Sequence, residues 1–84
     1  MKIVKDTNSV VIDYSEVIER VDAQGESNLI KVNKGNGFYY IGSVDRDQYE
    51  IIDVPSVPDD FVSGKYKYTT DFELNPDYVE PTRV

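Results

Sequence analysis

The stretch NLIKVNKGNGFYYIG, residues 28–42, decides the fold class. Two runs of apolar residues, many of them β-branched or aromatic, flank the segment KGNG at 34–37. An Asn-Gly pair between two apolar runs is the strongest short-range signal of a β-hairpin. The stretch therefore predicts two antiparallel strands, 28–33 and 38–42, joined by a tight turn.

The position of the turn sets the register that we expect. With Asn36 and Gly37 as the central turn residues, Val32 lies opposite Ile41. Because side chains alternate along a strand, bulky apolar groups then occupy both faces of the hairpin. One face carries Ile30, Val32, Tyr39 and Ile41, and the other carries Leu29, Phe38 and Tyr40. We expect cover on both faces, the second of them from another subunit.

Short apolar clusters separated by turn residues extend this pattern along the chain, which is typical of many short strands. Turn clusters stand at 6–9, 23–27 and 43–47, and the clusters between and beyond them predict strands at 10–14, 48–54, 65–70 and 72–74. Residues 15–21 fit either a short helix capped by Ser15 or a strand. We favour the strand, because so short a helix is weak in water.

These elements predict an all-β fold, a small antiparallel sandwich or open barrel of about five to seven short strands. Residues 1–75 form the single β domain in this interpretation. Proline at 76 and 81 ends regular structure, so residues 76–84 are expected to form an extended C-terminal tail.

Composition limits both the means of stabilisation and the function. The chain has 84 residues, no cysteine, no histidine and a formal net charge of −7. It therefore lacks disulfides, and its metal ligands are restricted to oxygen atoms. The charge opposes nucleic-acid binding, and no apolar run reaches the ~18 residues that span a bilayer. We expect no cofactor, no nucleic-acid partner, no membrane insertion and no secretory signal.

No catalytic or metal-binding pattern is recognisable. Nucleophilic catalysis needs an activated nucleophile and a base, but the formal pair Ser63 and Lys65 fits a turn before a strand. The acids within 45–50 lack the spacing of a calcium loop, and GNG at 35–37 lacks the continuation of a phosphate loop. The adjacent acids at 59–60 are typical of a solvated loop. The chain is therefore predicted not to be an enzyme and to hold no metal.

Seven Tyr and three Phe supply all of the aromatic side chains. The plain interpretation places most of them in the core, but Tyr on an exposed sheet is also a good anchor for another protein. Tyr beside an acid can alternatively stack on a sugar. Our candidate protein-contact residues are Tyr66, Tyr68, Phe72 and Tyr78.

The segments GKYKYT at 64–69 and FELNPDY at 72–78 resemble the C-terminal halves of short acidic proteins of tailed phages and prophages of Gram-positive bacteria. The relatives are encoded among structural and tail genes. Asp13-Tyr14 and Gly37-Phe38-Tyr39 also suit the group, and the resemblance covers about half of the chain. Asp71-Phe72 departs from it, because many relatives place glycine before that aromatic residue.

The resemblance implies a non-enzymatic structural or assembly protein of the virion or its tail. Such a protein is made in the bacterial host cytoplasm and resides in the phage particle. Its partners are other phage structural proteins and further copies of itself, with the C-terminal tail as a strap. Two alternatives stay open: a small acidic phage-encoded inhibitor of a host enzyme or defence system, and a carbohydrate-binding accessory module at a tail tip.

Overall fold

The computed structural model describes residues 1–79, which form eight β-strands and one short 3-10 helix. The all-β prediction is confirmed, with eight strands rather than five to seven. In chain order the elements are β1 (Lys2–Lys5), β2 (Val11–Ser15), β3 (Val17–Ala23), β4 (Glu26–Asn33), β5 (Phe38–Ile41), η1 (Arg46–Gln48), β6 (Glu50–Asp53), β7 (Tyr66–Tyr68) and β8 (Phe72–Leu74).

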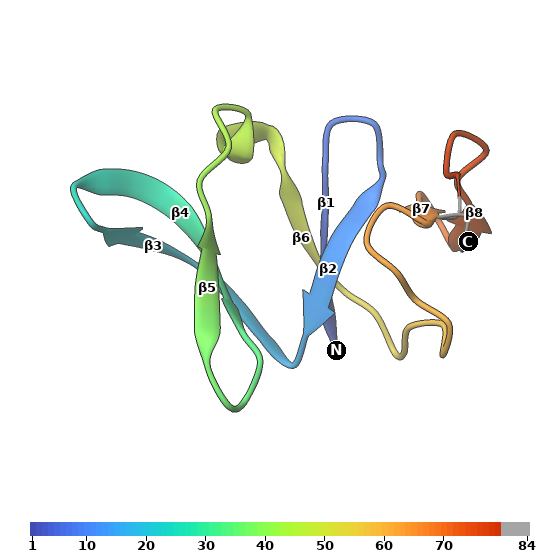
Figure 1. The fold of residues 1–84 in the computed structure, drawn as a ribbon, viewed down its shortest axis with the longest axis horizontal. Helices are drawn as coiled ribbons and strands as arrows, with labels where there is room; N and C mark the ends of the chain where they lie inside the picture. The colour runs from blue at the N-terminus through green and yellow to red at the C-terminus, as the bar shows by residue number, and fades with distance from the viewer. Residues whose placement is uncertain (80–84) are drawn as a thin grey trace, which may run out of the picture.

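Three antiparallel sheets lie side by side, in the orders β2-β1-β6, β3-β4-β5 and β7-β8. Figure 1 shows the sheet of β1, β2 and β6 between the other two. The central sheet packs on both faces because neighbouring residues of β1 point in opposite directions. Val4 joins a core with Ile18, Ile30 and Val32, whereas Ile3 joins a second core with Val11 and Val54.

A single bend connects the first two sheets, because only Glu16 separates the end of β2 from the start of β3. The Ser15 hydroxyl donates to the backbone carbonyl of Asn33, the last residue of β4, and accepts the backbone N–H of Val17 at 3.2 Å. The strand favoured for residues 15–21 is thus confirmed for its main part. Ser15 braces a corner between two sheets instead of capping a helix.

A β-bulge in β2 directs two neighbouring side chains to the same side. Val4 pairs with Asp13, but the next residue, Lys5, pairs with Val11, so β2 holds one extra residue here. Ile12 packs against the core shared with β3 and β4, and the Asp13 carboxylate accepts a hydrogen bond from a residue of β5. The bulge therefore places a carboxylate between the two larger sheets.

The hairpin of β4 and β5 forms, but the predicted register is wrong by two residues. Val32 pairs with Tyr39 rather than with Ile41, and Ile41 pairs with Ile30. A shift of two residues preserves the faces, because the side-chain period of a strand is two. The predicted grouping of Ile30, Val32, Tyr39 and Ile41 on one face therefore holds.

The register differs because the turn is centred on Gly35 and Asn36 instead of Asn36 and Gly37. The backbone N–H of Lys34 donates to the carbonyl of Gly37 at 2.8 Å, which closes the turn around these two residues. Gly35 has φ +88°, a conformation that side chains with a Cβ rarely adopt. Glycine therefore takes the first central position of the turn, where the positive φ favours it.

The face of this hairpin that points away from the central sheet is unevenly covered. Leu29 is buried, at 2% exposed, whereas Phe38 is 55% exposed. Phe38 packs edge to face on Tyr40, and the Lys31 ammonium lies 4.4 Å from the centre of its ring. Cover of this face by another subunit stays a prediction.

The third sheet forms as the sequence predicts, since Phe72–Leu74 pairs back with Tyr66–Tyr68. The predicted extended tail starts with a turn: the Tyr78 N–H donates to the Asn75 carbonyl at 3.1 Å. The Asn75 side-chain amide in turn donates to the Gly64 carbonyl at 2.9 Å. Residues 80–84 of the predicted tail lie outside the described residues.

The corner brace generates a prediction for stability. Ser15→Ala leaves the Asn33 carbonyl and the Val17 N–H without this partner, so we expect the free energy of unfolding to fall by about 1–2 kcal/mol. Urea denaturation followed by circular dichroism measures the change. The control is Ser56→Ala at an exposed position, expected within about 0.5 kcal/mol of wild type. Equal effects of the two substitutions would contradict the brace.

Candidate functional site

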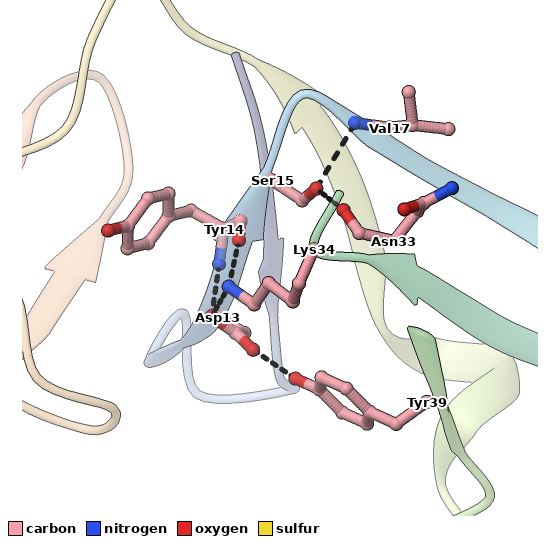
Figure 2. Close-up of polar contacts among 7 residues, drawn as sticks. All are labelled: Asp13, Tyr14, Ser15, Val17, Asn33, Lys34 and Tyr39. Atoms are coloured by element: carbon pink, nitrogen blue, oxygen red, sulfur yellow. Dashed lines mark hydrogen bonds and ion pairs between the residues drawn. The ribbon is translucent and has the colours of Figure 1, made fainter. Parts of the chain in front are cut away.

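A network of polar contacts fills the corner between the two larger sheets (Figure 2). Oδ1 of Asp13 accepts the backbone N–H of Tyr14 and the Lys34 ammonium, both at 2.7 Å. Its Oδ2 accepts the hydroxyl of Tyr39, and the Lys34 ammonium also donates to the Tyr14 carbonyl. We call this set the corner network; its members are Asp13, Tyr14, Ser15, Asn33, Lys34 and Tyr39.

The network shifts the ionisation of one member. Partial burial of Tyr39, which is 39% exposed, raises the pKa of its hydroxyl above the ordinary value of 10.0. The hydrogen bond to Asp13 and the negative charge of that carboxylate raise it further. Lys34 is fixed in addition by the ring of Tyr14, whose centre lies 4.6 Å from the ammonium. Tyr39 therefore acts as a hydrogen-bond donor across the gap between β5 and β2.

A hollow of about 560 Å³ opens beside the corner network, lined by Met1, Tyr14, Ser15, Glu16, Val17, Asn33, Lys34 and Gly35. Catalysis by Ser15 would require a base positioned to take its proton. Its hydroxyl instead donates to the Asn33 carbonyl, and the Lys34 ammonium is held by Asp13. The corner network holds the two larger sheets together, and the polar groups of Ser15 and Lys34 are hydrogen-bonded within it.

A chain of aromatic rings links the central sheet to the β7–β8 hairpin. Successive ring centres lie 5.1 Å, 6.5 Å, 6.2 Å and 4.9 Å apart, in the order Tyr14, Phe61, Tyr66, Phe72 and Tyr68. Three of the four candidate contact residues, Tyr66, Tyr68 and Phe72, are therefore half-buried members of this chain. Their rings stabilise the third sheet whether or not another protein binds there.

The four candidate contact residues divide between two hollows on the β7–β8 hairpin. Tyr66 and Tyr78 line a hollow of about 410 Å³, whose other lining residues are Asp60, Lys65, Leu74 and Asn75. Tyr68 and Phe72 line a hollow of about 350 Å³. We call the first set of six the hairpin surface. That these four residues contact another protein stays a prediction.

Three polar side chains are linked along one side of the hairpin surface. The Tyr66 hydroxyl donates to Oδ1 of Asp60 at 2.6 Å, and the Lys65 ammonium donates to Oδ2 at 2.9 Å. The hydrogen bond from Tyr66 lowers the pKa of the Asp60 carboxyl most, and the bond from Lys65 lowers it further. The hydrogen bond between Tyr66 and Asp60 also raises the pKa of the Tyr66 hydroxyl. Leu74, at 66% exposed, adds an apolar side chain to the same surface.

Sequence reasoning missed two arginines that hold loops through backbone carbonyls. Arg20 of β3 donates to the carbonyls of Arg46, at 2.8 Å, and Tyr49. Arg46 donates to the carbonyls of Ser27 and Gly42, both at 3.1 Å. No pattern in the sequence marks these contacts, because each joins residues from different turns and strands. Together they fix the connection that returns the chain from β5 to β6.

Two of the acidic residues considered as metal ligands from the sequence make other contacts within the fold. Asp47 accepts the side-chain amide of Asn28, and Asp60 belongs to the hairpin surface. Within residues 1–79, no three acidic side chains gather in a way that could hold a metal ion. None of the helices in that range has the length and apolar character needed to cross a membrane.

No family model, no curated protein and no solved structure matches the chain. The resemblance to phage structural proteins therefore stays a prediction based on the motifs at 64–69 and 72–78.

The raised pKa of Tyr39 predicts how stability changes in alkali. Folded Tyr39 holds its proton more tightly than the unfolded chain, so its contribution is complete below about pH 10 and declines as the pH rises further. In urea titrations between about pH 9 and 11, wild type should lose stability more steeply than Tyr39→Phe. Asp13→Asn, which removes the charge, should give an intermediate slope. Identical slopes for all three proteins would contradict the assignment.

The hairpin surface predicts a measurable shift for one carboxyl group. The side-chain carbon resonance of Asp60, followed by NMR during acid titration, should report a pKa below its ordinary value. Tyr66→Phe removes the hydrogen bond that lowers this pKa most and should move the pKa upward. Tyr68→Phe is the matched control, because its hydroxyl makes no hydrogen bond to Asp60 and the Asp60 pKa should stay unchanged. An Asp60 pKa that is ordinary in wild type would refute the bonded arrangement.

Proposed function

We propose that this protein is a non-enzymatic structural or assembly component of a phage particle that binds other phage proteins through its hairpin surface. The observation that carries the proposal is the exposed Leu74 beside the rings of Tyr66 and Tyr78, around one hollow. Protein interfaces commonly combine apolar and aromatic anchors with a polar rim. Asp60 and Lys65 supply such a rim here.

Hydrogen bonds within the fold hold the β7–β8 hairpin, which carries the hairpin surface, against the segment from β1 to β2. The Tyr68 N–H donates to the Ser9 carbonyl at 2.9 Å, and the Gly64 N–H donates to the Val11 carbonyl at 3.0 Å. Lys5 is a buried residue, and its ammonium donates to the Tyr68 carbonyl at 3.1 Å. Because the anchors are already ordered, binding loses less conformational entropy than it would for a mobile hairpin. This favours a role as a contact module.

The phage context comes from the sequence resemblance of residues 64–69 and 72–78. It makes other virion or tail proteins the expected partners and the assembled particle the expected location. The polar groups of the corner network are occupied within the fold, which supports a non-enzymatic role for that region.

The proposal predicts that surface changes on the hairpin reduce incorporation into particles. Leu74→Ser should lower the amount of protein in purified particles by about tenfold, the effect of losing roughly 1.4 kcal/mol of binding. Quantitative mass spectrometry of gradient-purified particles measures it. Val44→Ser is the matched control, because Val44 is 92% exposed but does not line the hairpin surface.

Two results would contradict this function. Complete absence of the wild-type protein from purified particles, with particle yield unchanged when its gene is deleted, would exclude a structural or assembly role. Normal incorporation of Leu74→Ser would exclude the hairpin surface as the contact, even if the protein is a particle component.

The net charge of −7 favours a second candidate, an acidic inhibitor of a host enzyme or defence system. An acidic surface can bind a basic site on such a target through complementary charge. This function predicts a protein that is dispensable for particle formation and that binds its host target less tightly as salt rises.

A further inference from the structure

The strand β5 has an unusual outer edge. It pairs with β4 on one side only, and its sequence Phe38-Tyr39-Tyr40-Ile41 contains no charged residue, in contrast to each of the other seven strands within residues 1–79. Natural sheets usually protect an open edge with charges, proline, a bulge or a covering segment. The opposite edge of the same sheet, β3, carries Glu19, Arg20 and Asp22.

The direction of the outward backbone groups follows from two contacts. The Lys34 N–H points to the Gly37 carbonyl, so this pair is hydrogen-bonded across the hairpin. The next pair, Asn33 and Phe38, is then of the non-hydrogen-bonded kind, because the two kinds alternate. The direction of the Asn33 carbonyl is consistent with this assignment, because it points away from β5 and accepts the Ser15 hydroxyl.

The N–H and carbonyl groups of Phe38 and Tyr40 therefore point away from β4, at the open edge of the sheet. Among residues 1–79, no hydrogen bond of the fold satisfies these four groups. The edge thus presents two donors and two acceptors beside aromatic side chains, and Phe38 is largely exposed.

We propose that β5 pairs with β5 of a second copy of this chain, antiparallel and about a two-fold axis at Tyr39. In that register Phe38 of each copy faces Tyr40 of the other, and each such pair exchanges two hydrogen bonds. All four outward groups of both strands are satisfied at once. The two sheets of β3, β4 and β5 become one continuous sheet of six strands.

The side chains select this register over its nearest rival. Pairing about Tyr39 covers each exposed Phe38 with the ring of Tyr40, and aromatic cross-strand pairs stabilise sheets. An axis at Tyr40 also satisfies the alternation of backbone groups, but it places Phe38 against Gly42. A glycine offers no side chain to cover the ring, so the axis at Tyr39 is favoured.

Self-complementarity argues for a second copy as the occupant. An isologous contact needs one patch that fits itself, and a short uncharged strand with alternating outward donors and acceptors does so. Two chains of net charge −7 repel each other. Pairing through β5 adds no close charge–charge contact between the paired strands, because residues 38–41 are all uncharged. Salt screens the long-range repulsion, so the association should strengthen as salt rises. The inference goes beyond the proposed function, because it uses an edge separate from the hairpin surface.

The first test is sedimentation velocity of the full-length protein over a range of concentrations and salt. We expect a monomer–dimer equilibrium that shifts toward dimer in high salt. Tyr40→Pro removes an outward N–H but no bond of the β4–β5 ladder, so it should raise the dimer dissociation constant by at least about tenfold. Circular dichroism verifies that the variant is folded. Tyr68→Phe serves as the control, at a position away from β5.

The second test reads the register directly, because the chain has no cysteine of its own. At a non-hydrogen-bonded pair the two Cα atoms lie about 4.5 Å apart, within the disulfide range of about 4.4–6.8 Å. Tyr39→Cys should therefore form a disulfide-linked dimer under mild oxidation. Tyr40→Cys is the matched control and should link poorly, because residue 40 faces residue 38 in this register.

Three outcomes would overturn the inference. A monomer at all concentrations and salt conditions excludes self-pairing of β5. The outer edge of β5 would then be available only to a strand of another protein. A dimer that Tyr40→Pro leaves intact excludes β5 as its interface. Efficient linkage of Tyr40→Cys without linkage of Tyr39→Cys places the axis elsewhere. Each result is independent of whether the hairpin surface binds phage proteins.

Discussion

The hydrogen bond from the Ser15 hydroxyl to the Asn33 carbonyl is the constraint on which the two larger sheets depend. It holds the end of β2 against the end of β4 at the point where the chain passes from one sheet to the other. This placement brings Asp13 within reach of Lys34 and Tyr39, and all three side chains pair there. A buried hydroxyl that both donates and accepts leaves little freedom at such a corner.

The second organising feature is the use of β1 by two cores. Val4 faces the core of β3 and β4, while Ile3 faces the core under the β7–β8 hairpin. A chain of 84 residues without cysteine has a thin stability margin, so each layer needs dense packing. The five-ring chain from Tyr14 to Tyr68 supplies it for the third sheet. This explains why so many aromatic residues lie near the C-terminal end.

Alternation and turn residues predicted most of the strands and the pairing of Phe72–Leu74 with Tyr66–Tyr68. The β4–β5 register was not predicted, because Gly35 and Gly37 both flank Asn36 and only the backbone conformation selects between them. The role of Ser15 was also invisible, since its partner lies 18 residues away. The stacking of Phe61 on Tyr66, one of the candidate contact residues, was not predicted either, because no local pattern determines the loop position of Phe61.

Native-state amide hydrogen exchange under increasing urea tests the central claim most directly. If the corner makes the two larger sheets one cooperative unit, the most protected amides of β1 and β4 should open with the same free energy. Their exchange curves should therefore merge as urea rises. Amides of β4 that open at a clearly lower free energy than those of β1 would show that the sheets unfold separately. The corner would then connect the two sheets without coupling them.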